Sequence, residues 1–135
     1  MTIARLIEGR KAAILTCNAD LPVRDAIALL AQRRIGALPV MADGRIAGIF
    51  SERDVIYQLQ ANGPAMLDSP VGEVMTSPAV TVDPQTEVLA ALSLMTRRRI
   101  RHLPVVQEDE LIGFVSIGDL VKVRIDRIES EAEAL

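Results

Sequence analysis

The chain has 135 residues, of which half are hydrophobic and only 2% are aromatic, and its formal net charge is −3. This length suits one compact domain, and the core must consist mainly of Leu, Ile, Val and Ala. No apolar run approaches the ~20 residues of a membrane span and no signal-peptide pattern opens the chain, so we expect a cytoplasmic protein.

The first half of the chain predicts a strand, a helix, a hairpin of two strands and a second helix. Pro22 suits the first position of the first helix, and the Asp43-Gly44 pair is a strong signal for the hairpin turn. Ser51 and Asp54 have the spacing of a capping box at the start of the second helix. The expected elements are a strand at 14–17, a helix from 22 to about 34, strands at 37–41 and 45–50, and a helix from 51 to about 59.

The single cysteine, Cys17, lies between Thr16 and Asn18 in the expected first strand. One cysteine cannot form an internal disulfide, and a free cysteine in an apolar strand usually behaves as a small core residue. We therefore expect Cys17 to be buried, with a reactive thiol as the alternative.

A Gly- and Pro-containing segment, "QANGPAMLDSP" at residues 60–70, separates the two halves and forbids a continuous helix between them. The following "VGEVMT" predicts a helical turn, which "LIEGRK" at residues 6–11 matches in the first half. The elements expected after this turn are a helix from 86 to 99, strands at 103–106 and 111–115, and a longer helix from 116 onward.

The two halves of the chain are copies of one unit. The pattern G-apolar-apolar-S-x-x-D occurs as "GIFSERD" from Gly48 and as "GFVSIGD" from Gly113, a shift of 65 residues. The same shift aligns the two halves without a gap and places the "LPV" at 38–40 on the "LPV" at 103–105. A fixed period of this kind indicates a tandem duplication.

The duplicated β-α-β-β-α pattern, both "LPV" strands and both G-apolar-apolar-S-x-x-D turns resemble the cystathionine-β-synthase (CBS) domain, and two in tandem resemble a Bateman module. The resemblance covers about residues 3–124. It implies an α+β fold in which two repeats pack with pseudo-two-fold symmetry around two clefts. The implied division is repeat 1 at 1–62, a linker at 63–72, repeat 2 at 73–126 and a C-terminal helical tail at 127–135.

In that family the clefts bind adenosine-containing nucleotides, which suggests a second role for the two helix starts. One carboxylate can accept from both ribose hydroxyls, so the resemblance implies ribose binding by Asp54 and Asp119. A helix N-terminus with a nearby hydroxyl suits a phosphate, which implies phosphate binding by Ser51 and Ser116. The same residues could be helix caps and no more, and the two roles are compatible.

Basic residues gather in the second copy, in "RRRIRHLPVV". Arg97–Arg99 are expected at the end of a helix, where cations complement the dipole and are usually solvated. In the family, residues placed like Arg101 and His102 reach phosphates, so the resemblance implies phosphate binding by both, at a site that the sequence does not determine. Arg53 is a further phosphate candidate, and its counterpart Gly118 has no side chain, so we expect unequal sites.

The family binds adenine with the segment that enters the first strand of the opposite repeat. The adenine-binding residues implied in this way are Ile14, Leu15, Thr76, Ala79 and Val80. Each of them could equally be an ordinary core residue.

The implied function is that of a stand-alone regulatory module without catalytic activity, which signals energy or redox state to a protein partner through AMP, ADP, ATP or NAD(H). The sequence does not choose among these ligands and S-adenosylmethionine. No nucleophile with a base, metal cluster or phosphate-binding loop suggests an enzyme. The alternatives are a structural dimerisation or scaffolding module with empty clefts, and a nucleic-acid binder that uses Arg97–His102, against which the acidic balance and the few aromatics argue.

The last expected helix supports a homodimer. Leu120, Val123 and Ile128 are apolar residues amid charges, and they are more than one small sheet needs for its cover. Modules of the family pair through their helices, so the resemblance implies that two copies of the chain associate.

Overall fold

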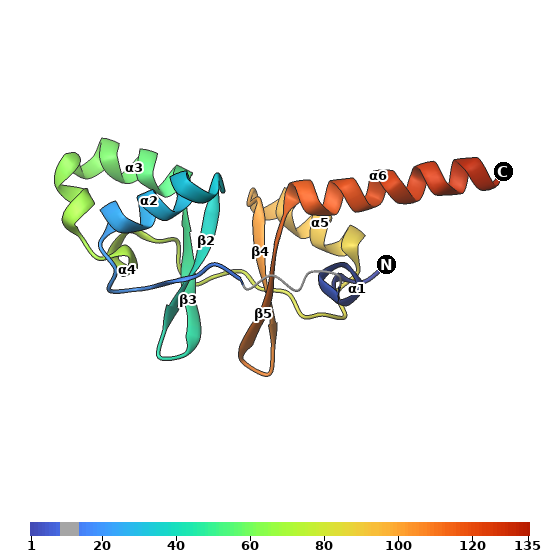
Figure 1. Cartoon of the computed structure of the whole chain (residues 1–135), viewed down its shortest axis with the longest axis horizontal. Coiled ribbons are helices and arrows are strands. Elements are labelled where there is room, and N and C mark those ends of the chain that lie inside the picture. Colours follow the sequence, from blue (N-terminus) through green and yellow to red (C-terminus); the bar gives the residue numbers. More distant parts are fainter. Residues whose placement is uncertain (9–13) are drawn as a thin grey trace. The chain divides into compact units, whose positions relative to one another are not determined.

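The computed structural model describes residues 1–8 and 14–135. It divides into two compact units (Figure 1). Each unit has its own hydrophobic core. The first-repeat unit comprises Leu15–Ala79, and the second-repeat unit comprises Val80–Leu135 together with Met1–Ile14.

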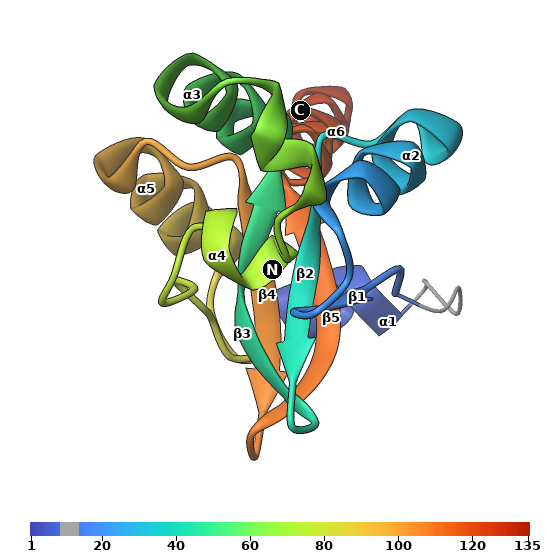
Figure 2. The ribbon, with the colours of Figure 1, turned by 90° about the vertical axis from the view of Figure 1, so that its left-hand side faces the viewer.

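The first-repeat unit is built on a three-stranded sheet in the order β1-β2-β3. Strand β2 pairs antiparallel with β3 and parallel with β1. The hairpin turn has positive φ angles at both Asp43 (53°) and Gly44 (77°), as the predicted Asp-Gly turn requires. This turn lies at the end of the hairpin away from α2 and α3 (Figure 2). The elements are β1 (Cys17–Asn18), α2 (Val23–Arg33), β2 (Ala37–Ala42), β3 (Arg45–Ser51), α3 (Glu52–Asn62), the 3₁₀ helix η1 (Pro64–Asp68) and α4 (Val71–Val74).

The second-repeat unit repeats the hairpin and its two helices. Strands β4 and β5 pair antiparallel with the same register and the same irregularity as β2 and β3. Ile3, at the start of α1, is fully buried in the core of this unit. The amide of Ile3 donates to the carbonyl of Thr86 at 2.9 Å, and the amide of Val88 donates to the carbonyl of Met1 at 2.9 Å. The elements are α1 (Ile3–Glu8), α5 (Val88–Arg98), β4 (His102–Gln107), β5 (Glu110–Ser116) and α6 (Ile117–Ala134).

The compact units therefore differ from the division at 1–62 and 73–126 that the repeats imply. The repeats describe the period of the sequence, whereas the N-terminal segment packs on residues more than eighty positions away. The helical turn expected at "LIEGRK" is present at residues 6–8, which are the last residues of α1. Residues 9–11 of this segment lie outside the described residues.

The first expected strand is wrong over most of its length. Of residues 14–17, only Cys17 is in a strand, because β1 pairs with β2 only through Cys17 and Asn18. Helices α2 and α5 also begin slightly later than expected, with Pro22 and Glu87 as extended residues just before them. Helices α3, α4 and α6 and strands β2 to β5 lie where the period and the turn signals predict them, apart from one to three residues at their ends. The 3₁₀ helix η1 was not predicted, because it lies in the segment expected to be a linker.

Cys17 is buried in the core of the first-repeat unit, as predicted. Burial disfavours the thiolate and raises the pKa of Cys17 to about 11. The buried thiol is therefore protonated at neutral pH, which argues against the reactive-thiol alternative.

Candidate functional site

Each repeat positions its Ser and Asp at the start of the helix that follows the hairpin. The backbone amide of Ser51 donates to Oδ2 of Asp54 at 2.9 Å, and the amide of Asp54 donates to Oγ of Ser51 at 3.3 Å. In the second repeat, the amide of Ser116 donates to Oδ2 of Asp119 at 2.8 Å, and the amide of Asp119 donates to Oγ of Ser116 at 3.1 Å. Both helix starts are therefore capping boxes, which fix the two carboxylates with respect to the backbone.

Asp54 has a further partner that the sequence did not indicate. Thr76 Oγ1 donates to Oδ1 of Asp54 at 2.8 Å. The backbone of Thr76 is held in place by two hydrogen bonds with Ile49, at 3.0 and 2.9 Å. Thr76, which the resemblance assigns to adenine, thus lies beside the carboxylate that it assigns to ribose, in the same unit.

Arg101 and His102 lie next to the start of α6. The amide of Ile117 donates to the carbonyl of Arg101 at 2.8 Å, and His102 is opposite Ser116 in the register of β4 and β5. The sequence left open which phosphate site these two residues serve, and the structure places their backbone beside the start of α6. The equivalent positions in the first repeat are Gly36 and Ala37, which have no basic group.

The ring of His102 stacks on Phe114, with ring centroids 5.4 Å apart and an interplanar angle of 13°. No motif in the sequence singles out Phe114. The register of the hairpin could have indicated it. His102 is opposite Ser116, and Phe114 lies two positions before Ser116 on the same strand, so the side chains of His102 and Phe114 share one face of the hairpin.

The other candidate residues lie as follows. Arg53 and Arg101 are exposed, while Ile14 and Ala79 are half-buried. Leu15 packs on the core of the first-repeat unit and Val80 on the core of the second-repeat unit. The packing of Leu15 and Val80 is what ordinary core residues also show, so their adenine role stays a prediction.

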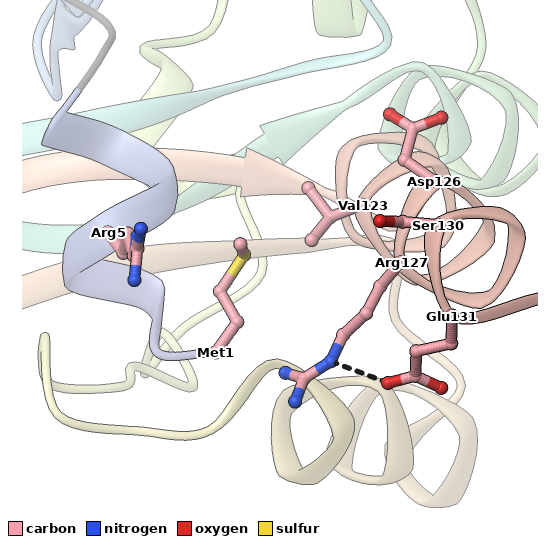
Figure 3. A pocket seen from close by; sticks show the side chains of 7 residues that line it. All are labelled: Met1, Arg5, Val123, Asp126, Arg127, Ser130 and Glu131. Atoms are coloured by element: carbon pink, nitrogen blue, oxygen red, sulfur yellow. Dashed lines mark hydrogen bonds and ion pairs between the residues drawn. The ribbon is translucent and has the colours of Figure 1, made fainter. Parts of the chain in front are cut away.

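A separate pocket of about 670 Å³ lies in the second-repeat unit between the N-terminal segment and α6 (Figure 3). None of the predicted site residues lines it. It mixes basic and acidic side chains, with Arg127 and Glu131 paired at 3.3 Å. The lining residues are Met1, Arg5, Val123, Asp126, Arg127, Ser130 and Glu131.

Within residues 1–8 and 14–135, no group of three or more His, Cys, Asp or Glu side chains is placed to hold a metal ion. In the same part of the chain, no helix has the length and apolar character needed to cross a membrane.

Gly48→Ala should destabilise the first-repeat unit by about 1–3 kcal/mol, because the position is already fully packed. A Cβ at Gly48 would lie 2.6 Å from the carbonyl oxygen of Thr76 and 2.7 Å from Sδ of Met75. The carbonyl cannot withdraw without straining the hydrogen bonds between Thr76 and Ile49. Urea unfolding of the parent and the variant measures the effect.

Gly118→Ala is the matched control for this substitution. The nearest heavy atom to a Cβ at Gly118 is Oγ of Ser116, at an ordinary 3.7 Å, and Gly118 lies in the first turn of α6. The control should be neutral or slightly stabilising, since Ala favours a helix over Gly. A loss at Gly118 as large as that at Gly48 would contradict the packing argument.

Comparison with known proteins agrees with the duplicated architecture. The sequence model of the CBS domain matches residues 11–61 and 71–126. The CBS domain-containing protein CBSX3, mitochondrial, of Arabidopsis thaliana is 39% identical over 126 residues, which cover 90% of this chain and 61% of that protein. The CBS domain-containing protein YhcV of Bacillus subtilis is 32% identical over 122 residues, which cover 90% of this chain and 86% of that protein.

A solved structure supports the same relationship. A protein with CBS domains from Burkholderia ambifaria MC40-6 is 37% identical, with a TM-score of 0.86 and coverage of 93% of this chain and 95% of that chain. The chain spans about three fifths of the length of its Arabidopsis relative and most of the other two. It therefore belongs to the CBS-domain family and carries two CBS domains in tandem.

Proposed function

We propose that this tandem CBS module is regulatory and binds adenosine-containing nucleotides at its two helix starts. The observation that carries the proposal is the carboxylate that each repeat fixes at the beginning of a helix, at Asp54 and at Asp119. A rigid carboxylate is suited to accept hydrogen bonds from the two adjacent hydroxyls of a ribose.

The environment of Asp54 supports a hydroxyl ligand. Oδ1 of Asp54 already accepts from the hydroxyl of Thr76 at 2.8 Å, from outside the capping box. A ribose hydroxyl would form the same kind of bond with this oxygen. Because Asp54 is partly exposed, its carboxylate remains within reach of solvent.

The phosphates of the nucleotide would bind unequally at the two helix starts. Ser51 and Ser116 place a hydroxyl and a helix N-terminus at each start. The second repeat adds Arg101 and His102 beside Ser116, whereas the first repeat offers only the exposed Arg53. We therefore propose that the site at Asp119 prefers the more highly phosphorylated ligand.

A solved structure with the same fold holds ligands of the adenosine class. The CBS domain pair of protein MJ0100, 19% identical with a TM-score of 0.81, was solved in complex with 5′-methylthioadenosine and S-adenosyl-L-methionine. The likeness at this identity concerns the fold. What it supports here is the adenosine class, with AMP, ADP, ATP, NAD(H) and S-adenosylmethionine as the candidates to test.

Ligand-induced stabilisation tests the proposal. A nucleotide at ~100 times its dissociation constant adds about 2.7 kcal/mol per site, so AMP, ATP or NAD(H) should raise the melting temperature by several degrees. GMP and GTP are the matched controls and should raise it less, because the adenine slot that the resemblance implies would be matched by fixed backbone groups. If no adenosine compound raises the melting temperature at millimolar concentration, the module is a scaffold.

The scaffold is the second candidate because both capping boxes are complete without a ligand. In either case we propose that two copies of the chain associate and that the module acts on a protein partner. Several large apolar side chains are exposed on α6, which supports association.

A further inference from the structure

Helix α6 has two apolar faces, and only one of them belongs to its own unit. Leu120 is fully buried, and Val123 packs on the core of the second-repeat unit and lines the pocket. The expectation that Leu120 and Val123 are more than the unit needs for its own cover is therefore wrong, since both side chains pack within the unit. The helix nevertheless continues to Ala134, well beyond the part that packs on α5 (Figure 1).

The second apolar face is exposed. Val121, Ile125 and Ile128 expose 39%, 48% and 48% of their surface, and Ala132 follows on the same face. These four residues, called here the α6 stripe, have successive spacings of four, three and four positions. This is the a/d spacing with which two helices pack against each other in a coiled coil.

Charged residues beside the α6 stripe change sign along the helix. Lys122 and Arg124 flank its beginning, and Glu129 and Glu131 flank its end. Lys122 and Glu129 lie on one edge, at e positions, and Arg124 and Glu131 on the other, at g positions. A helix that is basic at one end and acidic at the other complements a copy of itself that runs in the opposite direction.

The two possible directions give different ion pairs. When Ile125 of one copy lies opposite Ile128 of the other in an antiparallel pair, e positions face e positions, so each Lys122 meets a Glu129. On the other edge each Arg124 meets a Glu131, which gives four attractive pairs in all. A parallel pair in register joins only g to the following e position, which gives two pairs of Arg124 with Glu129.

We infer that α6 stripes of two copies pack antiparallel, with Ile125 of one copy against Ile128 of the other. This inference rests on the homodimer proposed above and assigns its surface. The first turns of α6 are already ordered by their own unit through Leu120, so pairing does not require the helix to nucleate. The layers would be Ile against Ile at the centre and Val121 against Ala132 at each end.

Sedimentation equilibrium of the full chain tests the surface. Ile125→Asp combined with Ile128→Asp places charges in the centre of the paired stripe and should weaken the dimer at least ~100-fold. Ile56→Asp is the matched control, because Ile56 lies on α3 and is 64% exposed. The control should remain dimeric. If Ile56→Asp abolishes the dimer and the α6 variant keeps it, the α6 inference is wrong, although the protein is still a homodimer. If the parent is monomeric, both the α6 inference and the proposed homodimer are wrong.

Charge reversal tests the direction. Lys122→Glu should weaken an antiparallel dimer about tenfold, because two attractive pairs become repulsive. Adding Glu129→Lys to the same chain should restore the parent dissociation constant. Within residues 1–8 and 14–135 neither Lys122 nor Glu129 forms an ion pair, so both changes leave the unit intact.

A parallel pair gives the opposite result. Lys122→Glu would then have little effect, and the double variant would be weaker than the parent because the lysine introduced by Glu129→Lys would face Arg124. That outcome overturns the antiparallel arrangement. Nucleotide-induced thermal shifts of the same variants report on the ligand sites separately, so failure of the α6 inference and failure of ligand binding are distinguishable.

Discussion

Asp119→Asn should lower the affinity of the second-repeat site for adenine nucleotide by roughly ten- to a hundredfold, while the protein remains folded. The side chain of the introduced asparagine keeps one oxygen, which can still accept from the backbone amide of Ser116. The other capping bond runs from the backbone amide of Asp119 to Oγ of Ser116 and does not involve the side chain of Asp119. Both capping hydrogen bonds can therefore persist, and the loss of a charge near the helix dipole costs about 0.5 kcal/mol. The ligand loses one acceptor and meets a donor in its place, which costs ~1–3 kcal/mol.

Asp54→Asn should have the same effect at the first-repeat site. Here the carboxylate accepts from the amide of Ser51 through Oδ2 and from the hydroxyl of Thr76 through Oδ1. In the variant, the remaining oxygen can serve Ser51, and the hydroxyl of Thr76 can turn to accept from the new NH₂ group. The fold is thus retained, but the atom offered to ribose is changed from an acceptor to a donor.

Asp25→Asn is the matched control for both variants. Asp25 occupies the third position of α2, as Asp54 and Asp119 do in α3 and α6, but α2 has no side-chain cap. The control should lose the same dipole interaction without any change in ligand affinity. Calorimetric titration with nucleotide and urea unfolding measure the two quantities. If Asp54→Asn and Asp119→Asn bind as tightly as the parent and melt several degrees lower, both residues are helix caps only.

Features fixed by neighbouring residues could be predicted from the sequence. The Asp43-Gly44 turn, the two capping boxes and the duplication each depend on a few adjacent positions or on one period. The second hairpin is informative because its turn uses Glu108 and Asp109 with φ angles of 51° and 64° and contains no glycine. The period predicts this hairpin even though the turn residues do not.

Features that depend on distant residues could not be predicted in this way. The hydrogen bond from Thr76 to Asp54 joins residues 22 positions apart, and the local sequence of neither residue indicates it. The apolar letters at 14–17 suggested a strand, but a strand also requires a partner, and of these four residues only Cys17 pairs with β2. The position of Arg101 at the start of α6 follows from strand pairing for the same reason.

The longest-range feature is the packing of the N-terminal segment on the second repeat, and Ile3→Ala tests it. Ile3 is fully buried in the core of the second-repeat unit, where it packs in a cluster that includes Val88 and Leu103. Removing three carbon atoms from this core should lower the free energy of unfolding by about 2–5 kcal/mol. The melting temperature should fall by roughly 5 °C or more, measured by circular dichroism.

Two further variants separate a core effect from a loss of hydrophobicity alone. Ile3→Val removes one methyl group and should cost about 0.5–1.5 kcal/mol, between the parent and Ile3→Ala. Ile56→Ala makes the same chemical change at a side chain that is 64% exposed, and it should stay within about 0.5 kcal/mol of the parent. Because the amides of Ile3 and Ala4 donate to the carbonyls of Thr86 and Pro84 at 2.9 and 2.8 Å, the segment cannot easily shift to fill the cavity. A melting temperature of Ile3→Ala equal to that of Ile56→Ala would show that the N-terminal helix adds nothing to the second-repeat core.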